Sequence, residues 1–203
     1  MKHLNLDDLG QYSDVLLLRS GTAVTVRFVE VADAEALQGY FRGLSTRSRY
    51  NRFMGAASEL PAGQLQKFIH VGEADSFSVV ATISRDGAET IVGEARYAFD
   101  ELTSRFEMGL SVADSMQGQG VGAALLSNLE CRAAALDADF LFGDTLRSNE
   151  AMLALARKAG FTFAPTPGDW KQMRFEKQID TTPARTSCAT WRLAAQSLQP
   201  TLA

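Results

Sequence analysis

The sequence is poor in residues that bind metals and in long apolar segments. It has 2 cysteines and 2 histidines among 203 residues, and neither His3 nor His70 has other ligand residues at the spacing that a metal requires. We therefore predict no metal site. No apolar run approaches the roughly 20 residues of a membrane-spanning helix, which argues against a membrane protein. The net charge of −4 argues against nucleic acid as the main partner.

The amino-terminal segment also lacks the pattern of a signal peptide. Its one apolar run, Val15–Leu18, is short and follows Asp7, Asp8 and Asp14 rather than basic residues. A cytoplasmic location is therefore the default prediction. Cys131 falls within a predicted helix, and we expect it to be a buried, reduced thiol.

Length and composition favour one domain with short extensions. The hydrophobic and charged fractions, 46% and 22%, are those of an ordinary soluble protein. We expect an amino-terminal extension over residues 1–21, a folded domain over 22–180, and a linker with a tail helix over 181–203. The linker is rich in Thr, Pro and Ser. The tail places Trp191 and Leu198 on one helical face, which we expect to dock on the domain.

The spacing of apolar residues predicts a mixed α/β fold. Strands are expected at residues 22–29, 77–84, 90–99, 106–112, 140–146, 161–164 and 172–179. Helices are expected at 34–44, 62–70, 120–136 and 149–158. In the helix at 120–136, Val121, Leu125 and Leu129 share one face. This order places antiparallel hairpins first and a β-α-β-α-β arrangement second.

Residues 104–124, SRFEMGLSVADSMQGQGVGAA, carry the most informative motif. A strand ends at Val112, and a polar stretch leads from it to Gln117-Gly-Gln-Gly-Val-Gly122 and a helix. Glycines at alternate positions let the backbone turn its N–H groups inward, and the helix adds unpaired N–H groups and the positive end of its dipole. Such a nest of N–H groups binds a phosphate or a pyrophosphate.

Two phosphorylated cofactors compete for this loop. Gly118, Gly120 and Ala123 satisfy the dinucleotide motif G-x-G-x-x-A, and Asp144 on the next strand could bind a ribose hydroxyl. The context disagrees, because a dinucleotide fold places its first glycine directly after a strand near the start of the sheet. Here residues 113–117 intervene, and the chain that follows is too short for the second half of such a sheet.

The stronger resemblance is to the GNAT superfamily of acyl-CoA-dependent N-acyltransferases. Gln117-x-x-Gly120-x-Gly122 matches the family's Q/R-x-x-G-x-G/A motif, and Leu110-Ser-Val112 resembles the end of its splayed fourth strand. Asn149 resembles the asparagine that opens the next helix, and Gly160-Phe161 resembles the Gly-Phe that closes it. The resemblance covers roughly residues 22–180 and implies a central, mostly antiparallel sheet flanked by helices.

Within the superfamily, the amino half is similar to the Pat-type protein lysine acetyltransferases. Leu44-Ser-Thr-Arg-Ser-Arg-Tyr-Asn-Arg-Phe53 is similar to their Leu-Ser-x-x-Ser-Arg-Tyr-x-Arg-Phe segment, and we expect Arg52 in it to form a structural ion pair. Phe106–Val112 is similar to their acidic fourth strand. We expect no fused cyclic-nucleotide-binding or ligase-like domain of the kind that many of those enzymes carry, so regulation and substrate stay open.

The resemblance implies acetyl-CoA as cosubstrate and Glu107 as general base. A lysine amine has a pKa of about 10.4 and must lose a proton before it can attack a thioester. The backbone of Leu110–Val112 is expected to pair with the pantetheine arm, and Asn149 to combine an N-cap with a cofactor contact. The expected cofactor-binding residues are Leu110, Ser111, Val112, Gln117, Gly118, Gln119, Gly120, Val121, Gly122, Ala123 and Asn149.

One position departs from the family pattern. Many members have a tyrosine seven residues after the asparagine, and here that residue is Ala156. The group that protonates the departing thiolate is therefore open, with water, Tyr12, Tyr50 and Tyr97 as candidates.

We predict an N-acetyltransferase that moves acetyl from acetyl-CoA to a primary amine by direct attack in a ternary complex. A protein lysine is the preferred acceptor. A small-molecule amine acetyltransferase and a non-catalytic acyl-CoA-binding regulator are the alternatives, and the regulator would have no need of a base at Glu107. The sequence leaves a homodimer open.

Overall fold

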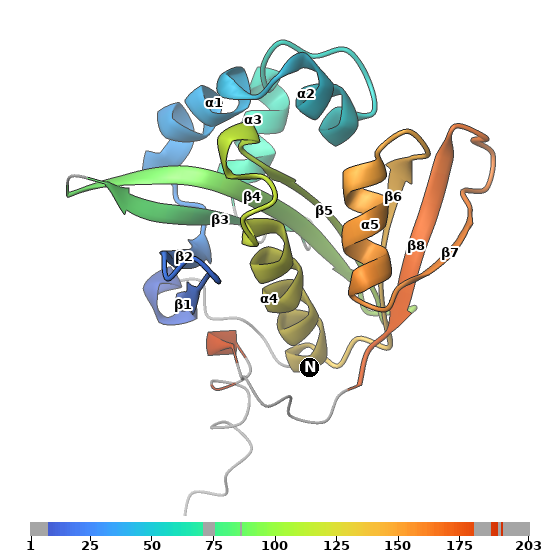
Figure 1. Ribbon diagram of the computed structural model, residues 1–203. Coiled ribbons are helices and arrows are strands. Elements are labelled where there is room, and N and C mark those ends of the chain that lie inside the picture. Colours follow the sequence, from blue (N-terminus) through green and yellow to red (C-terminus); the bar gives the residue numbers. More distant parts are fainter. Residues whose placement is uncertain (1–7, 71–75, 86, 181–187, 191, 193–203) are drawn as a thin grey trace, which may run out of the picture.

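The computed structural model describes residues 8–70, 76–85, 87–180, 188–190 and 192. A twisted sheet of eight strands runs through the molecule (Figure 1). The strands are β1 (Asp14–Leu17), β2 (Ala23–Phe28), β3 (Ser76–Arg85), β4 (Ala88–Asp100), β5 (Arg105–Val112), β6 (Phe140–Leu146), β7 (Thr162–Pro165) and β8 (Gln172–Gln178). Their spatial order is β1-β2-β3-β4-β5-β6-β8-β7.

All neighbouring strands are antiparallel except β5 and β6. That one parallel contact needs a crossover, which α4 (Val121–Ala135) supplies. The predicted mixed α/β fold with a mostly antiparallel sheet is thus confirmed.

Helices cover both faces of the sheet (Figure 1). On one face lie α1 (Ala34–Gly43), α2 (Thr46–Phe53) and α3 (Ala62–Ile69). On the other face lies α4, while α5 (Glu150–Lys158) stands beside β6 and β8. Short 3-10 turns occupy Leu9–Tyr12, Val31–Asp33 and Asp114–Met116.

Each face of the sheet has its own apolar core. The larger core includes the α4 face that the sequence predicts, since Val121, Leu125 and Leu129 are all fully buried. The smaller core gathers Phe41 and Phe68 beneath α1 and α3. Because helices press on the sheet from both sides, the central strands are held firmly enough to position a site between them.

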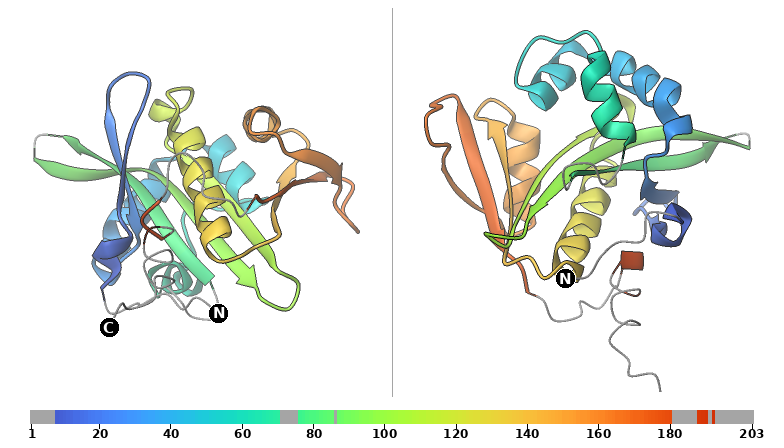
Figure 2. Two further views of the ribbon diagram at one scale, coloured as in Figure 1. Left: turned by 90° about the horizontal axis from the view of Figure 1, so that it is seen from below. Right: turned by 180° about the vertical axis from the view of Figure 1, so that it is seen from behind.

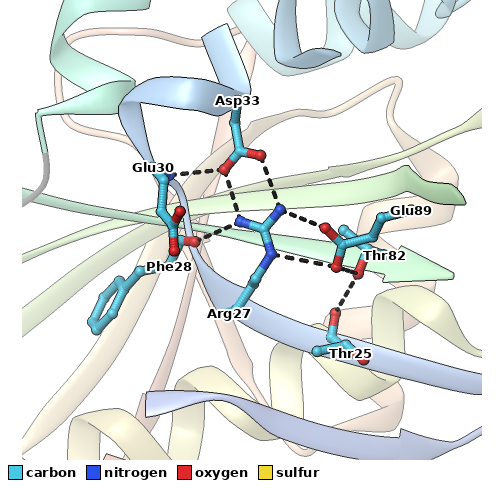
Figure 3. Close-up of polar contacts among 7 residues, drawn as sticks. All are labelled: Thr25, Arg27, Phe28, Glu30, Asp33, Thr82 and Glu89. Carbon is cyan, nitrogen blue, oxygen red and sulfur yellow. Dashed lines mark hydrogen bonds and ion pairs between the residues drawn. The ribbon is translucent and has the colours of Figure 1, made fainter. Parts of the chain in front are cut away.

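Arg27 on β2 joins three separate elements (Figure 3). Its guanidinium makes a two-point ion pair with Asp33 at the start of α1 and also bonds both carboxylate oxygens of Glu89 on β4. Burial raises the pKa of Asp33, but the hydrogen bonds from Arg27 and from the Glu30 amide outweigh it and hold that pKa below its usual value. Arg27 therefore fixes the chain as it leaves the sheet for the first helices.

The structure adds two elements that the sequence did not predict. Asp14–Leu17, within the predicted amino-terminal extension, pairs with β2 as the outermost strand of the sheet. The basic stretch Thr46–Phe53 is a helix, capped by the Ser45 side chain, which accepts a hydrogen bond from the Ser48 amide. The boundaries at residues 21 and 180 stay predictions.

The expectation of a reduced Cys131 is wrong, because Cys131 on α4 forms a disulfide with Cys188. The described carboxy-terminal residues lie between the amino-terminal hairpin and α4 (Figure 2). The Ala189 amide donates to the buried carboxylate of Asp14 at 2.7 Å, and Arg132 donates to Thr190. This docking brings the two cysteines together, which sequence spacing alone does not show. Trp191 and Leu198, predicted to dock the tail, lie outside the described residues.

Candidate functional site

The parallel strands β5 and β6 separate in the middle of the sheet. They pair from Arg105 to Glu107 on β5 and from Phe140 to Phe142 on β6, and no later residues of these two described strands pair. Gly143 follows directly on β6, where a Cβ atom would lie 2.5 Å from the carbonyl oxygen of Met108. Glycine is therefore required at the point of closest approach, and Glu107 is the last paired residue before the strands part.

A pocket of about 380 Å³ lies where the strands part. It brings together three residues of the predicted site, Glu107, Leu110 and Asn149. Its walls also include Arg96 on β4 and Asp144 on β6, to which the sequence assigned no role in acetyl transfer. The size is within the usual range for a small-molecule site.

Glu107 offers an uncommitted carboxylate to this pocket. It is exposed, and within the described chain it makes no hydrogen bond or ion pair. A neighbouring cation, Arg174, is held by Asp144 at 2.7 Å. The pKa of Arg174 is raised first by that hydrogen bond to Asp144 and, to a smaller extent, by attraction to Glu107. The carboxylate of Glu107 is thus free to accept a proton or to bind an ammonium group.

The carboxyl half of β5 rests on a buried polar network that the sequence did not reveal. Ser111 donates to Glu94 at 2.6 Å and shares a hydrogen bond with Tyr40 at 2.9 Å. Glu94 is fully buried and forms an ion pair with Arg52 at 2.6 Å, as predicted for that arginine. Gly109 leaves room for the Arg52 guanidinium, because a Cβ there would lie 3.0 Å from its Nη1. The network holds the side chains on one face of this half of β5. Among the described strands, only β4 pairs with the backbone of this half.

Beyond β5, the glycine loop presents a row of unpaired amides. Gly118 and Gly120 have positive φ angles of 74° and 101°. Within the described chain, the N–H groups of residues 118–120 have no hydrogen-bond acceptor, and the first hydrogen bond of α4 is from the Ala124 amide to the Gly120 carbonyl. The first-turn amides of residues 121–123 have no intrahelical partner, as at any helix start. The predicted nest is therefore present in its backbone geometry.

The glutamine side chains of this loop are committed to the chain itself. Gln117 donates to the Val112 carbonyl at 3.1 Å, and Gln119 donates to the Ser115 carbonyl at 2.7 Å. Neither supplies a charge. An anion at this loop would be attracted mainly by the backbone amides and the α4 dipole.

Asp114 attaches the same loop to the start of α2. Its carboxylate accepts hydrogen bonds from the amide and hydroxyl of Ser45 and from the hydroxyl of Ser48. Burial raises the pKa of Asp114, but these hydrogen bonds outweigh it and leave that pKa below its usual value. The polar stretch after β5 therefore positions a helix, a role that its composition alone did not indicate.

Asn149 has the N-cap role that its position predicts. Its Oδ1 accepts from the Met152 amide at 3.3 Å, and its Nδ2 donates to Thr145 at 3.0 Å. One side-chain N–H remains for a ligand. Seven residues later, Ala156 is fully buried in the core, so no acidic group faces the pocket from that position.

The three candidate tyrosines do not bring a hydroxyl into the pocket. Tyr97 lines the pocket, but its hydroxyl is fully buried. Burial raises the pKa of this hydroxyl, and the positive charge of Arg132, on the opposite face of the sheet, lowers it to a smaller extent. Tyr12 is buried in the larger core, and Tyr50 is on the outer surface of α2. None of the three is placed to protonate a leaving group.

Comparison with known proteins agrees with this geometry. The sequence model of the Acetyltransferase (GNAT) family matches residues 40–161. The chain belongs to the GNAT acetyltransferase family. It is therefore an acetyl-CoA-dependent N-acetyltransferase. A curated relative, Acetyltransferase PA5475 of Pseudomonas aeruginosa, is 28% identical over 156 residues, which are 77% of this chain and 84% of that protein.

Solved structures share the GNAT fold. The GNAT domain of S. lividans PAT has a TM-score of 0.74 at 24% identity, covering 83% of this chain and 97% of that one. The ribosomal-protein-S5-alanine acetyltransferase of Vibrio fischeri has a TM-score of 0.62 at 18% identity, covering 79% and 96%. A cAMP-binding acyltransferase of Mycobacterium smegmatis has a TM-score of 0.57 at 22% identity, covering 91% of this chain and 52% of that one.

GNAT enzymes use acetyl-CoA, and the residues present here fit that molecule. Consecutive free amides over residues 118–120, continued by the first turn of α4, suit a pyrophosphate, and the strand edge beside the pocket suits an amide-bearing arm. In the described part of the chain, no helix has the length and apolarity to cross a bilayer.

Proposed function

We propose that this GNAT enzyme acetylates a primary amine of a protein lysine, with Glu107 as the general base in a ternary complex. The observation that carries the proposal is the uncommitted carboxylate of Glu107 at the point where β5 and β6 part. An amine that enters the pocket from outside meets this carboxylate beside the strand edge of Leu110–Val112.

The cofactor path follows from the order of features along the chain. Backbone amides of residues 118–123 would bind the pyrophosphate, and the unpaired edge of Leu110–Val112 would pair with the pantetheine arm. Asn149 has one side-chain N–H left, which it could donate across the gap between β5 and β6. The thioester, which supplies the activated acetyl group, would then lie near Glu107.

Glu107 would perform the proton transfer that the reaction needs. A lysine amine is protonated near neutral pH, and only its neutral form is a nucleophile. The Glu107 carboxylate, directly or through one water, can accept the proton as the amine attacks. The departing thiolate would take its proton from water, since Ala156 and the candidate tyrosines present no acid to the pocket.

A lysine acceptor is supported by the similarity of Leu44–Phe53 to the Pat-type segment. A small-molecule amine is the second candidate, because the pocket of about 380 Å³ is of ordinary size for a small ligand.

A cytoplasmic location also remains a proposal. The disulfide between Cys131 and Cys188 weighs against it, since such bonds persist mainly in oxidising compartments.

The test is the Glu107→Gln variant, which keeps the shape of the side chain but cannot accept a proton at neutral pH. Turnover on an amine acceptor should fall about a hundred- to ten-thousand-fold, the usual value of general-base assistance. CoA affinity, measured by calorimetry, should barely change. Activity should recover as pH rises toward the pKa of the amine, because the free base then forms without help.

Glu101→Gln is the matched control, since Glu101 is exposed in the turn between β4 and β5, outside the pocket. A small loss in Glu107→Gln that stays flat with pH would sink the assignment of the base. Slow CoA release with no turnover on any amine by the wild type would point to a regulator instead.

A further inference from the structure

Arg96 on β4 lies on the same face of the sheet as Glu107. In the β4–β5 ladder, Arg96 is opposite Gly109 and Ala98 is opposite Glu107, so the two charged residues are diagonal neighbours. Diagonal neighbours on adjacent strands have Cα atoms about 7–8 Å apart, within reach of an arginine and a glutamate. They nevertheless form no ion pair with each other, and both line the pocket.

The side chain of Arg96 is turned onto an aromatic ring. Its guanidinium carbon lies 5.2 Å from the centre of the Phe68 ring, on the α3 side of the sheet. Contact with a ring uses the face of a guanidinium and leaves its N–H groups, which point outward in the plane, available to an oxygen acceptor. Phe68 thus orients the cation without neutralising it.

Arg96 differs in this from the other partly buried arginines. Within the described chain it has no hydrogen bond or ion pair. Four others have carboxylate partners: Arg27 with Asp33, Arg52 with Glu94, Arg105 with Glu176, and Arg174 with Asp144. The nearby carboxylate of Glu94 is occupied, because both of its oxygens bind Arg52. Burial and the positive charge of Arg52 lower the pKa of Arg96. A half-buried cation without a partner is costly and is expected to have an anionic ligand.

From this arrangement, and on the basis of the proposed function, we propose that the acceptor amine carries a carboxylate, which Arg96 binds while Glu107 faces the amine. The pocket offers one uncommitted charge of each sign, and an amine with a nearby carboxylate matches both. The carboxylate can belong to a free ω-amino acid or to an acidic side chain beside a lysine. The phosphate nest lies beyond the far end of β5, so Arg96 is not placed to bind the pyrophosphate.

The test compares amines that differ only in a carboxylate. Three pairs cover a range of lengths: 3-aminopropanoate and propylamine, 4-aminobutanoate and butylamine, and 6-aminohexanoate and hexylamine. Thiol release from acetyl-CoA gives kcat/KM for each. In at least one pair, the wild type should prefer the carboxylate-bearing amine by about ten- to a hundredfold, the usual strength of a hydrogen bond to a charged group.

Arg96→Gln should bring this ratio close to one, and Arg96→Lys should retain part of it. Arg47→Gln is the matched control, because Arg47 is exposed on α2 and outside the pocket, and it should leave the ratio unchanged. A peptide lysine flanked by Asp or by Asn distinguishes the sources. A preference seen only between these peptides assigns the carboxylate to a protein side chain.

A ratio near one in the wild type for all three amine pairs and also for the Asp and Asn peptides, or a preference that survives Arg96→Gln, would overturn the inference while the proposed function stands. A loss of CoA affinity in Arg96→Gln as large as the loss of preference for the carboxylate would also overturn it, since Arg96 would then bind the cofactor. If the wild type acetylates no amine, the proposed function fails, and calorimetry with 6-acetamidohexanoate against N-hexylacetamide still tests Arg96. Binding of the carboxylate compound that is lost in Arg96→Gln supports the inference, and equal binding of both compounds contradicts it.

Discussion

Replacing Gly143 by alanine is the most direct perturbation of the point where β5 and β6 separate. A Cβ atom there would lie 2.5 Å from the Met108 carbonyl oxygen and 2.6 Å from Cζ of Phe175. Real Cβ atoms do not approach other atoms so closely, so a strand or the Phe175 ring must move. One of the two contacts is with backbone, which cannot rotate away as a side-chain end can.

We expect Gly143→Ala to lower the free energy of unfolding by about 1–3 kcal/mol, the usual cost of overpacking a buried site. For a chain of this size, that corresponds to a melting temperature lower by roughly 2–12 °C. Turnover should fall as well, because Phe142, the neighbour of Gly143, pairs with Glu107. Urea denaturation followed by circular dichroism measures the first effect, and thiol release measures the second.

Gly39→Ala provides the control. Gly39 is exposed within α1, and a Cβ there meets no atom within 4 Å. Alanine in a helix interior is favoured over glycine by up to about 1 kcal/mol, so this variant should be slightly more stable than the wild type. If Gly143→Ala is as stable as Gly39→Ala, the close approach of the strands at the point where they separate is not a constraint, and the reasoning fails.

Three further outcomes follow from other parts of the structure. Gly122→Val should weaken CoA binding in calorimetry, because a Cβ at residue 122 meets Leu155 at 3.2 Å and Val112 at 3.6 Å, so the branched side chain must shift the first turn of α4, which carries nest amides. Circular dichroism checks that the variant is folded. Unchanged affinity in folded protein would contradict the nest, and tight NADH binding by the wild type would restore the dinucleotide interpretation. Cys188→Ser removes a crosslink between residues 57 apart in sequence, which raises the conformational entropy of the unfolded chain. The free energy of unfolding, measured in urea, should therefore fall by about 4 kcal/mol. A wild type that is equally stable with and without reductant would refute this. Because Asp33 has a lowered pKa in the folded state, its contribution is present above its unfolded pKa near 3.8 and is lost as pH falls through the lower folded value. Melting temperatures of the wild type should therefore fall more steeply below about pH 4 than those of Asp33→Asn, and parallel curves would show that Asp33 is not the titrating group.

Much of the fold was predictable from periodicity and from a few motifs. Strands β2 and β5 alternate in hydrophobicity, and α4 has a continuous apolar face, so local pattern and final structure agree. The glycine loop was predictable for a different reason. Positive φ angles at Gly118 and Gly120 belong to the residues themselves rather than to their distant neighbours.

What could not be predicted depends on contacts between distant residues. The polar helix α2 has no buried residue of its own and is positioned by Asp114, which lies 66 and 69 residues from its partners Ser48 and Ser45. The disulfide depends on how the chain after β8 returns to α4. The lack of a carboxylate partner for Arg96 could not be predicted either, because it depends on where the surrounding side chains lie in the fold.

The splay between β5 and β6 also bears on the solubility of the protein. An unpaired strand edge on the outside of a sheet can pair with other chains and seed aggregation, and proteins usually shield such edges. Here the edge at Leu110–Val112 faces inward across a pocket, with β6 and α5 on the other side. A narrow, flexible arm can reach it, but a strand from a second molecule would meet that opposing wall. The molecule thus keeps backbone groups available for a ligand without presenting them to its neighbours in solution.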